Sequence, residues 1–340
     1  TNEAGEEVST SETFVPEKVN DLNVAATYTA NFAENANVTI NYVAETGGSV
    51  TPGSESLAPA TGIAAGSTAT AVSGYHFVNW MNEAGEEVST SETFVPEKVN
   101  GLNVAATYTA NFTEDDGVRI IYNRKPIAGG YLSKYMDDNV APVTGTATGS
   151  TATANPGYHF VNWTNEAGEE VSTSETFVPE KVNGLNVAAT YTANFTEDDG
   201  VRIIYNRKPI AGGYLSKYMD DNVAPVTGTA TGSTATANPG YHFVNWTNEA
   251  GEEVSTSETF VPEKVNGLNV AATYTANFAE DADVTISYVA ETGGSVTPGS
   301  ESLAPATGTA NGSSATANPG YHFVNWTNEA GEEVSTSETF

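Results

Sequence analysis

Apolar and polar residues alternate in short runs throughout the chain. In the segment NVAATYTANF, Val104, Ala106, Tyr108, Ala110 and Phe112 fall on one face, and mostly Thr and Asn residues occupy the other. A period of two residues is typical of a β-strand with one buried face. The segment therefore predicts a strand, and its last seven letters recur several times along the sequence.

Four further runs have the composition or alternation of strands: VTINYV at 38–43, GSTATA at 66–71, HFVNW at 76–80 and EEVST at 86–90. We expect the last two to pair as a hairpin, because Gly85 between them supplies the positive φ of a tight turn. The stretch 91–101 is the place where a helical turn can form, and Pro96 keeps such a turn short.

The chain is a tandem repeat. GYHFVNW occurs at 74–80, 157–163, 240–246 and 320–326, and the block 113–195 recurs letter for letter as 196–278. A fixed period of this size indicates one small module repeated in a row. It also argues against a single active site, because a residue in one copy has a counterpart in the next.

The repeat boundaries follow from the first and last strands of each copy. Complete units are expected at 37–112, 117–195 and 200–278, the C-terminal part of a preceding repeat at 1–32, and a repeat that stops before its last strand at 283–340. The linkers between them have five residues, which leaves little room for hinging. The predicted architecture is mainly β, with at most one short helical turn per unit, arranged as an elongated rod.

The charge and the cysteine content of the chain exclude or disfavour several classes of function. The 340 residues include 12 Lys and Arg against 43 Asp and Glu, a formal net charge of −31. This charge excludes binding to nucleic-acid phosphates, which needs a basic surface, and it disfavours anionic membranes. The chain has no cysteine, which fits a bacterial surface protein better than a disulfide-bonded eukaryotic secreted module. No apolar run is long enough for a membrane-spanning helix.

The signatures GYHFVNW and ATYTANF, with a Gly-containing hairpin between them, resemble the divergent internalin-B B-repeat family. The opening VTINYVAETGGSVTP resembles that family's first hairpin, and the likeness covers nearly all of each unit. The resemblance implies a small β-grasp-like fold in an extracellular, wall-associated or secreted protein of a Gram-positive bacterium. It implies no catalytic residue and no cofactor. Asn79 and Asn162 depart from the family pattern, which often has Gly before the Trp.

The units are of two kinds. The first and last read VAETGGSVTPGSESLAP after their first strand, whereas the middle two read NRKPIAGGYLSKYMDDNVAP at 123–142 and 206–225. The longer version places cations in the first half of a unit whose second half has an acidic hairpin at Glu166, Glu169 and Glu170. One hypothesis is that the basic part contacts an acidic hairpin of a neighbouring unit or of a parallel chain. The alternative is a solvated surface, because exposed ion pairs contribute little.

Aromatic and apolar residues also enter with the longer version. Beside the cations they could form a patch that binds a partner, or they could cover the unit's own sheet edge. The interaction candidates are Arg124, Lys125, Tyr131, Leu132, Lys134, Tyr135, Met136, Arg207, Lys208, Tyr214, Leu215, Lys217, Tyr218 and Met219.

The sequence gives little evidence for a catalytic or a metal-binding site. Asp115, Asp116, Asp137 and Asp138 offer oxygen ligands suited to calcium, but not at the spacing of an EF-hand loop. Each of the four histidines stands alone beside a Tyr and a Phe, without a second His, a Cys or a Ser–Asp set that would complete a nucleophile triad. Lys98 and Asn100 could in principle join in an isopeptide bond, yet their polar, turn-like surroundings favour exposure.

The function that fits best is a non-enzymatic structural region, an extended stalk or filament on a bacterial surface. A second hypothesis is an adhesin whose repeats bind a host or partner ligand through the longer segment. A third is a hydrolase whose catalytic domain lies outside this sequence. Expected partners are neighbouring repeats, other copies of the chain in a filament, or a host surface ligand, with no nucleic acid and no direct membrane insertion.

Overall fold

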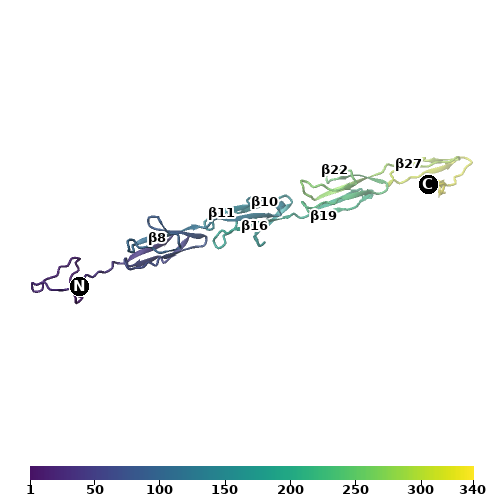
Figure 1. The fold of residues 1–340 in the computed structure, drawn as a ribbon. Coiled ribbons are helices and arrows are strands. Elements are labelled where there is room, and N and C mark those ends of the chain that lie inside the picture. The colour runs from purple at the N-terminus through teal and green to yellow at the C-terminus, as the bar shows by residue number, and fades with distance from the viewer.

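The computed structural model describes residues 1–340 as a row of small β-sheet bodies with the two ends of the chain far apart (Figure 1). The strands run along the length of the row. The chain has no α-helix, and its helical residues are two 3-10 turns of three residues, η1 at Ile127–Gly129 and η2 at Ile210–Gly212. The predicted β-rich, tandem architecture is confirmed.

The first body contains eight strands in two sheets. They are β1 (Val38–Ala44), β2 (Gly48–Thr51), β3 (Ser54–Leu57), β4 (Ser67–Ala71), β5 (Tyr75–Met81), β6 (Glu87–Ser89), β7 (Thr93–Phe94) and β8 (Ala106–Glu114). One sheet has the order β3-β1-β8-β5-β6, and the other has the order β2-β4-β7. Residues of both sheets pack into one core, with Ile40, Tyr42, Trp80 and Ala110 from the first sheet and Ala69 and Phe94 from the second.

The second and third bodies repeat this arrangement. The second has β9 (Val118–Lys125), β10 (Gly130–Leu132), β11 (Met136–Val140), β12 (Ser150–Ala154), β13 (Tyr158–Thr164), β14 (Glu170–Ser172), β15 (Thr176–Phe177) and β16 (Ala189–Glu197). The third has β17 (Val201–Lys208), β18 (Gly213–Leu215), β19 (Met219–Val223), β20 (Ser233–Ala237), β21 (Tyr241–Thr247), β22 (Glu253–Ser255), β23 (Thr259–Phe260) and β24 (Ala272–Glu280). Their five-stranded sheets are β11-β9-β16-β13-β14 and β19-β17-β24-β21-β22.

The first and last strands of a body lie side by side and parallel. In the first body Ile40 pairs with Ala106 and Ala44 with Ala110. The last strand pairs on its other side with β5, antiparallel, from Tyr75 opposite Glu114 to Met81 opposite Thr109. Parallel neighbours need a long crossover, and here the crossover is the rest of the body.

A tryptophan forms the centre of each core. Trp80, Trp163 and Trp246 are completely buried, and the indole N–H of Trp80 donates a 3.1 Å hydrogen bond to the carbonyl of Glu92. In the second body Tyr122 lies edge-on to Trp163, with ring centroids 6.0 Å apart. Aromatic pairs of this kind combine a large buried area with a specific geometry, which suits a core as small as this one.

The two ends of the chain have less sheet. Residues 26–32 have the same letters ATYTANF as β8 but lie outside any strand, and the partners that flank β8 have no counterpart within 1–32. In the last body the strands form three separate pairs: β25 (Val284–Ser287) with β27 (Ser300–Leu303), β26 (Gly294–Thr297) with β28 (Ser314–Ala317), and β29 (Trp326–Thr327) with β30 (Glu333–Ser335). In neither stretch does a strand lie between two other strands, as β8 does in the first body.

Two local predictions were wrong. The stretch 91–101 has no helical turn, because Thr93 and Phe94 pair with Thr68 and Ser67 as strand β7 and Phe94 enters the core. The expected first hairpin also does not form. Strands β1 and β2 belong to different sheets, since the chain turns at Gly47, which has a φ of 109°, and crosses to the second layer.

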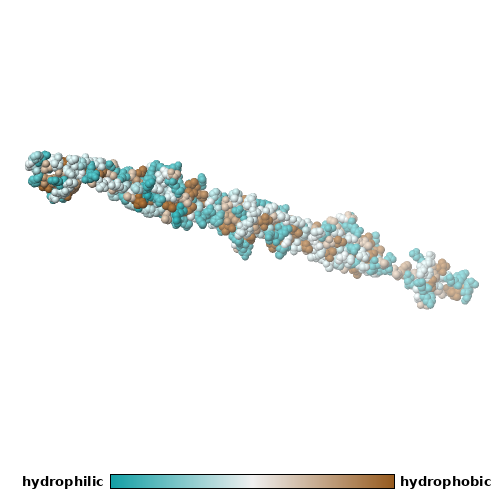
Figure 2. All heavy atoms as spheres, turned by 180° about the vertical axis from the view of Figure 1, so that it is seen from behind, coloured by the Kyte–Doolittle hydropathy of each residue, from teal (hydrophilic) through white to brown (hydrophobic).

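Exposed apolar residues are scattered along the rod. On the face shown in Figure 2, the hydrophobic patches are separated by hydrophilic and neutral surface. Isolated patches of this kind are normal on a folded protein.

Because each hydrophobic core lies within one body, a core substitution should destabilise that body alone. Trp163→Ala should destabilise the second body by about 3–5 kcal/mol through lost burial and a cavity. In calorimetry of the full chain, the unfolding of the second body should appear as a separate transition at lower temperature. The control Tyr131→Ala removes an exposed side chain and should change stability by less than about 0.5 kcal/mol. A uniform downward shift of the whole transition would contradict independent cores.

Candidate functional site

The joint between successive bodies is the first candidate site, because a rod depends on it. Strand β8 ends at Glu114 and β9 begins at Val118, so the linker has three residues rather than the five expected. The carboxylate of Glu114 accepts hydrogen bonds from the next body: Oε1 from the backbone N–H groups of Val143 (2.5 Å) and Thr144 (2.9 Å), and Oε2 from the Thr144 hydroxyl (2.7 Å).

The same arrangement occurs at four places along the chain. Glu34, Glu114, Glu197 and Glu280 bind the turns at Ala60–Thr61, Val143–Thr144, Val226–Thr227 and Ala306–Thr307, respectively. We call each of these a glutamate clamp. Hydrogen bonds from Thr144 hold the pKa of Glu114 below its ordinary value, so the clamp is fully charged at neutral pH.

Apolar contact and a lysine complete the joint. Gly74 has a φ of 85°, and a Cβ placed on it would lie 2.5 Å from Val143 Cγ2 and 2.9 Å from Leu185 Cδ2 of the next body. A side chain at position 74 would therefore displace Val143 and Leu185 and disturb the contact between the two bodies. Lys181 donates from Nζ to the carbonyl of Val143, on the same turn that the clamp binds.

The lysines considered for an isopeptide bond thus lie at the joints. Lys98 is exposed, as its surroundings predicted, and its Nζ donates a 2.5 Å hydrogen bond to the carbonyl of Ala60. Neighbouring Asn100 occupies a turn with a φ of 49°.

Histidines lie next to three of the joints. Nδ1 of His76 is 2.9 Å from Oδ1 of Asp115 in the linker, and His159 with Asp198 and His242 with Asp281 repeat this pair. Both side chains of the first pair are about half exposed, so solvent screens the interaction. These are surface histidines that contact the linker.

The residues considered as calcium ligands are not gathered in one place. Asp115 contacts His76, Asp116 is exposed, and Asp138 pairs with Arg119 at 2.9 Å. No group of three or more His, Cys, Asp or Glu residues is positioned to hold a metal ion.

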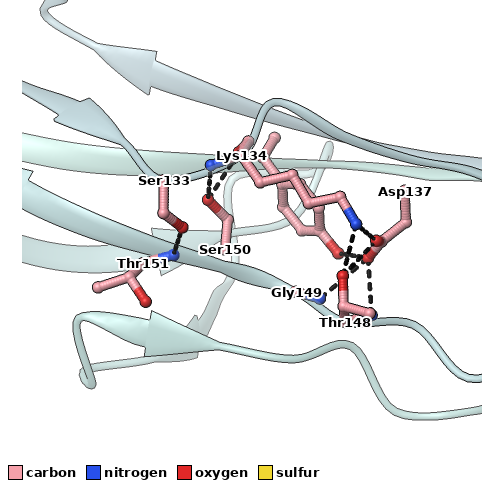
Figure 3. A network of polar contacts seen from close by, with 8 residues as sticks. Ser133, Lys134, Asp137, Thr148, Gly149, Ser150 and Thr151 are labelled. Atoms are coloured by element: carbon pink, nitrogen blue, oxygen red, sulfur yellow. Dashed lines mark hydrogen bonds and ion pairs between the residues drawn. The ribbon is translucent and has the colours of Figure 1, made fainter.

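Asp137 has a different role in the second body. Its side chain is 3% exposed and accepts hydrogen bonds from the Tyr122 hydroxyl (2.8 Å) and from the backbone N–H groups of Thr148 (3.0 Å) and Gly149 (2.9 Å). The Thr148 hydroxyl and Lys134 Nζ also contact it (Figure 3). This carboxylate joins the edge strand β11 and the neighbouring strand β9 to the turn before β12, and so it connects the two sheets.

Burial opposes ionisation of Asp137, but the hydrogen bonds from Lys134, Thr148, Gly149 and Tyr122 outweigh it and hold the pKa well below its ordinary value. The pKa of Tyr122 is raised by burial and by its bond to this carboxylate. Asp137 is therefore an ionised structural anchor at neutral pH.

The other bodies have an equivalent carboxylate. Asp220 repeats the network in the third body. In the first body Glu55 receives the Tyr42 hydroxyl and the N–H groups of Ala65 and Gly66, and in the last body Glu301 receives Tyr288 and the turn at Asn311 and Gly312. Both kinds of unit thus connect their two sheets through a carboxylate. It is a Glu in the short kind and an Asp in the long kind, where a lysine also contacts it.

The interaction candidates of the longer segment do not form one surface. Leu132 was predicted as part of a binding patch, but it is 5% exposed and belongs to the core, as does Leu215. This part of the prediction was wrong because β10 alternates, with Gly130 and Leu132 facing inward and Tyr131 outward. Met136 points outward from the other sheet, opposite Ile121, so Tyr131 and Met136 lie on opposite faces of the body.

The cations of the longer segment bind within their own unit. Lys134 contacts Asp137, Arg119 pairs with Asp138, and the Arg124 guanidinium lies 5.6 Å from the centre of the Tyr135 ring and donates to the carbonyl of Gly130. Arg207, Lys217 and Tyr218 repeat these contacts in the third body. No ion pair joins a cation to the acidic hairpin of a neighbouring unit. Lys125, Lys208, Tyr131, Tyr214, Met136 and Met219 are exposed.

Asn79, where the family pattern often has Gly, forms a polar bridge. Its Nδ2 donates to Glu87 on β6 at 2.7 Å, and its Oδ1 accepts from Asn111 on β8 at 2.9 Å. The bridge connects three adjacent strands next to the bulge between Phe77 and Asn79. Asn162 makes the same contacts with Glu170 and Asn194.

Comparison with known families agrees with this geometry. The model of the divergent InlB B-repeat domain matches residues 38–116, 124–199, 207–282 and 284–340. The chain belongs to this family, whose members are repeats of bacterial surface proteins. It is a structural repeat region. A comparison with curated proteins found no match, and none of the chain's helices is long and apolar enough to span a membrane.

The glutamate clamp was missed in the sequence, although a signal was present. At all four places a Glu stands two residues after the Phe of ATYTANF, and each turn that donates hydrogen bonds to it reads Pro, then Ala or Val, then Thr. Sequence reasoning considered only the aspartates of the linker, as calcium ligands, because the turn that binds the glutamate lies 26–30 residues further along the chain.

The low pKa of Asp137 predicts the pH range in which it stabilises the fold. Its folded pKa lies below the unfolded value of about 3.9, so its contribution is fully present above about pH 5 and is lost as the pH falls through and below the unfolded value. Asp137→Asn should cost about 2–4 kcal/mol at pH 7, because donors that face the carboxylate lose their acceptor. Urea unfolding at pH 7 and pH 3 measures both effects.

The difference between variant and parent should shrink at pH 3, where the parent has lost part of the same stabilisation. The adjacent Asp138→Asn serves as a matched control, since its exposed pair with Arg119 contributes little. An equal loss from both substitutions would contradict the anchoring role of Asp137.

Proposed function

We propose that this chain is the repeat region of a bacterial cell-surface protein and serves as an extended stalk or filament that projects other functions from the surface. The clamped three-residue joint carries this proposal. A flexible string of domains needs linkers that move freely. Here the linker after the first body has three residues, and the second body is bound by the charged Glu114 carboxylate and by packing at Gly74. Repeat units at 37–112, 117–195 and 200–278 are the modules of this stalk.

Charge and family support the same proposal. A net charge of −31 keeps an elongated chain soluble and disfavours its folding back on itself. Membership of a family of surface-protein repeats favours a non-catalytic structural module. A cell-wall-associated or secreted location in a Gram-positive bacterium belongs to the proposal as well.

The alternative of an adhesin that binds ligand through the longer segment has weaker support. Its residues are divided between the core, two opposite faces and internal ion pairs. A binding patch needs its anchor residues together at the centre of one surface.

The joint can be tested by spin-label distances, because the chain has no cysteine of its own. Glu83→Cys and Glu166→Cys place labels on equivalent exposed hairpins of the first two bodies. We expect a narrow distance distribution in this background, and a distribution about twofold broader or more after Glu114→Ala removes the clamp, since the joint would then depend on packing alone.

Glu92→Ala removes an exposed carboxylate of the same body away from the joint and should leave the distribution unchanged. A broad distribution in the parent chain would overturn the stiff stalk, whatever the effect of Glu114→Ala.

A further inference from the structure

The position of the first and last strands suggests a role beyond spacing. The chain enters the second body at Val118, the start of β9, and leaves it at Glu197, the end of β16. These two strands are immediate neighbours and parallel, paired from Ile120 with Ala189 to Lys125 with Asn194. The entry and exit points therefore lie at opposite ends of one strand pair.

Tension along the chain acts on this pair in a particular way. It pulls β9 toward its beginning and β16 toward its end, so the strands can separate only by sliding along each other. In that geometry the ladder hydrogen bonds share the load and must break together. A pair pulled apart from one end instead loses its bonds one at a time, with each bond bearing the whole load.

The core opposes sliding as well. Tyr122 on β9 is completely buried, lies against Trp163 and donates to Asp137, and Ala193 on β16 is also completely buried. Movement of β9 by one residue pair would place the other face of the strand inward. It would remove Tyr122 from its pocket and bring Ile121 and Asn123 toward the core.

We propose that each complete body is a load-bearing module in which the parallel pair of first and last strands resists tension along the stalk. This inference rests on the proposed stalk function and adds mechanical resistance to it. The first body has five residue pairs between these strands, at 40–44 and 106–110, and the second and third have six, at 120–125 with 189–194 and 203–208 with 272–277.

The test compares two directions of pulling on the same folded body in the full chain. Asp116→Cys with Asp199→Cys attaches handles just before β9 and just after β16, which loads the pair along its length. Asp116→Cys with Val187→Cys attaches handles just before each strand, at the same end of the pair. All three positions are exposed, and circular dichroism checks that both variants keep the parent fold.

Single-molecule force measurement should give an unfolding force at least about twofold higher for the lengthwise attachment, because forced unfolding depends on the barrier along the pulled direction rather than on overall stability. Both variants contain the same body, so a difference in thermodynamic stability does not explain such a result. Equal forces, or a higher force for the same-end attachment, would overturn the proposal. Failure of this test leaves the spin-label test of the stalk untouched, so the two proposals can fail separately.

Discussion

The structure depends on the return of the last strand of each unit to the middle of the sheet. Strand β8 lies between β1 and β5 and supplies partners to both. Without such a strand, the neighbours have free edges and only one ladder each. In the three complete bodies this strand joins two pairs of strands into one five-stranded sheet. The pairing also joins residues distant in sequence, so its formation carries a loop-closure entropy cost.

The joint uses the same strand for a second purpose. Because β8 extends to Glu114, its last side chain reaches the next unit while its backbone is held by the sheet. Because the clamping glutamate lies on a fixed strand, it sets the orientation of the next body. The same glutamate on a mobile loop would hold the two bodies together without fixing their orientation. The histidine and aspartate beside it add a contact that solvent screens, so orientation rests on the carboxylate, the lysine and the packing at Gly74.

Much of the fold could be predicted from alternation and repetition, because both are local. Strands at 38–43, 66–71 and 76–80 were correctly predicted, and so was the hairpin across Gly85. The assignment of β1 and β2 to different sheets was not visible, since a Gly-rich turn fits a hairpin and a crossing between layers equally well. The burial of Leu132 and Asp137 depends on the corresponding change of sheet in the second body, between β9 and β10. Alternation along β10 and β11 shows which residues share a face, but only the sheet order shows which face is inside.

The two kinds of unit present the same ends despite their different first halves. Both close with a Phe followed two residues later by the clamping glutamate, and both accept that glutamate with a turn of Pro, a small or branched apolar residue, and Thr. A short unit can therefore follow a long one, or the reverse, with no change to the connection. The number of units and the order of short and long units can therefore change without any change in the joint. Copies can be inserted, removed or reordered, and each new joint would use the same contacts.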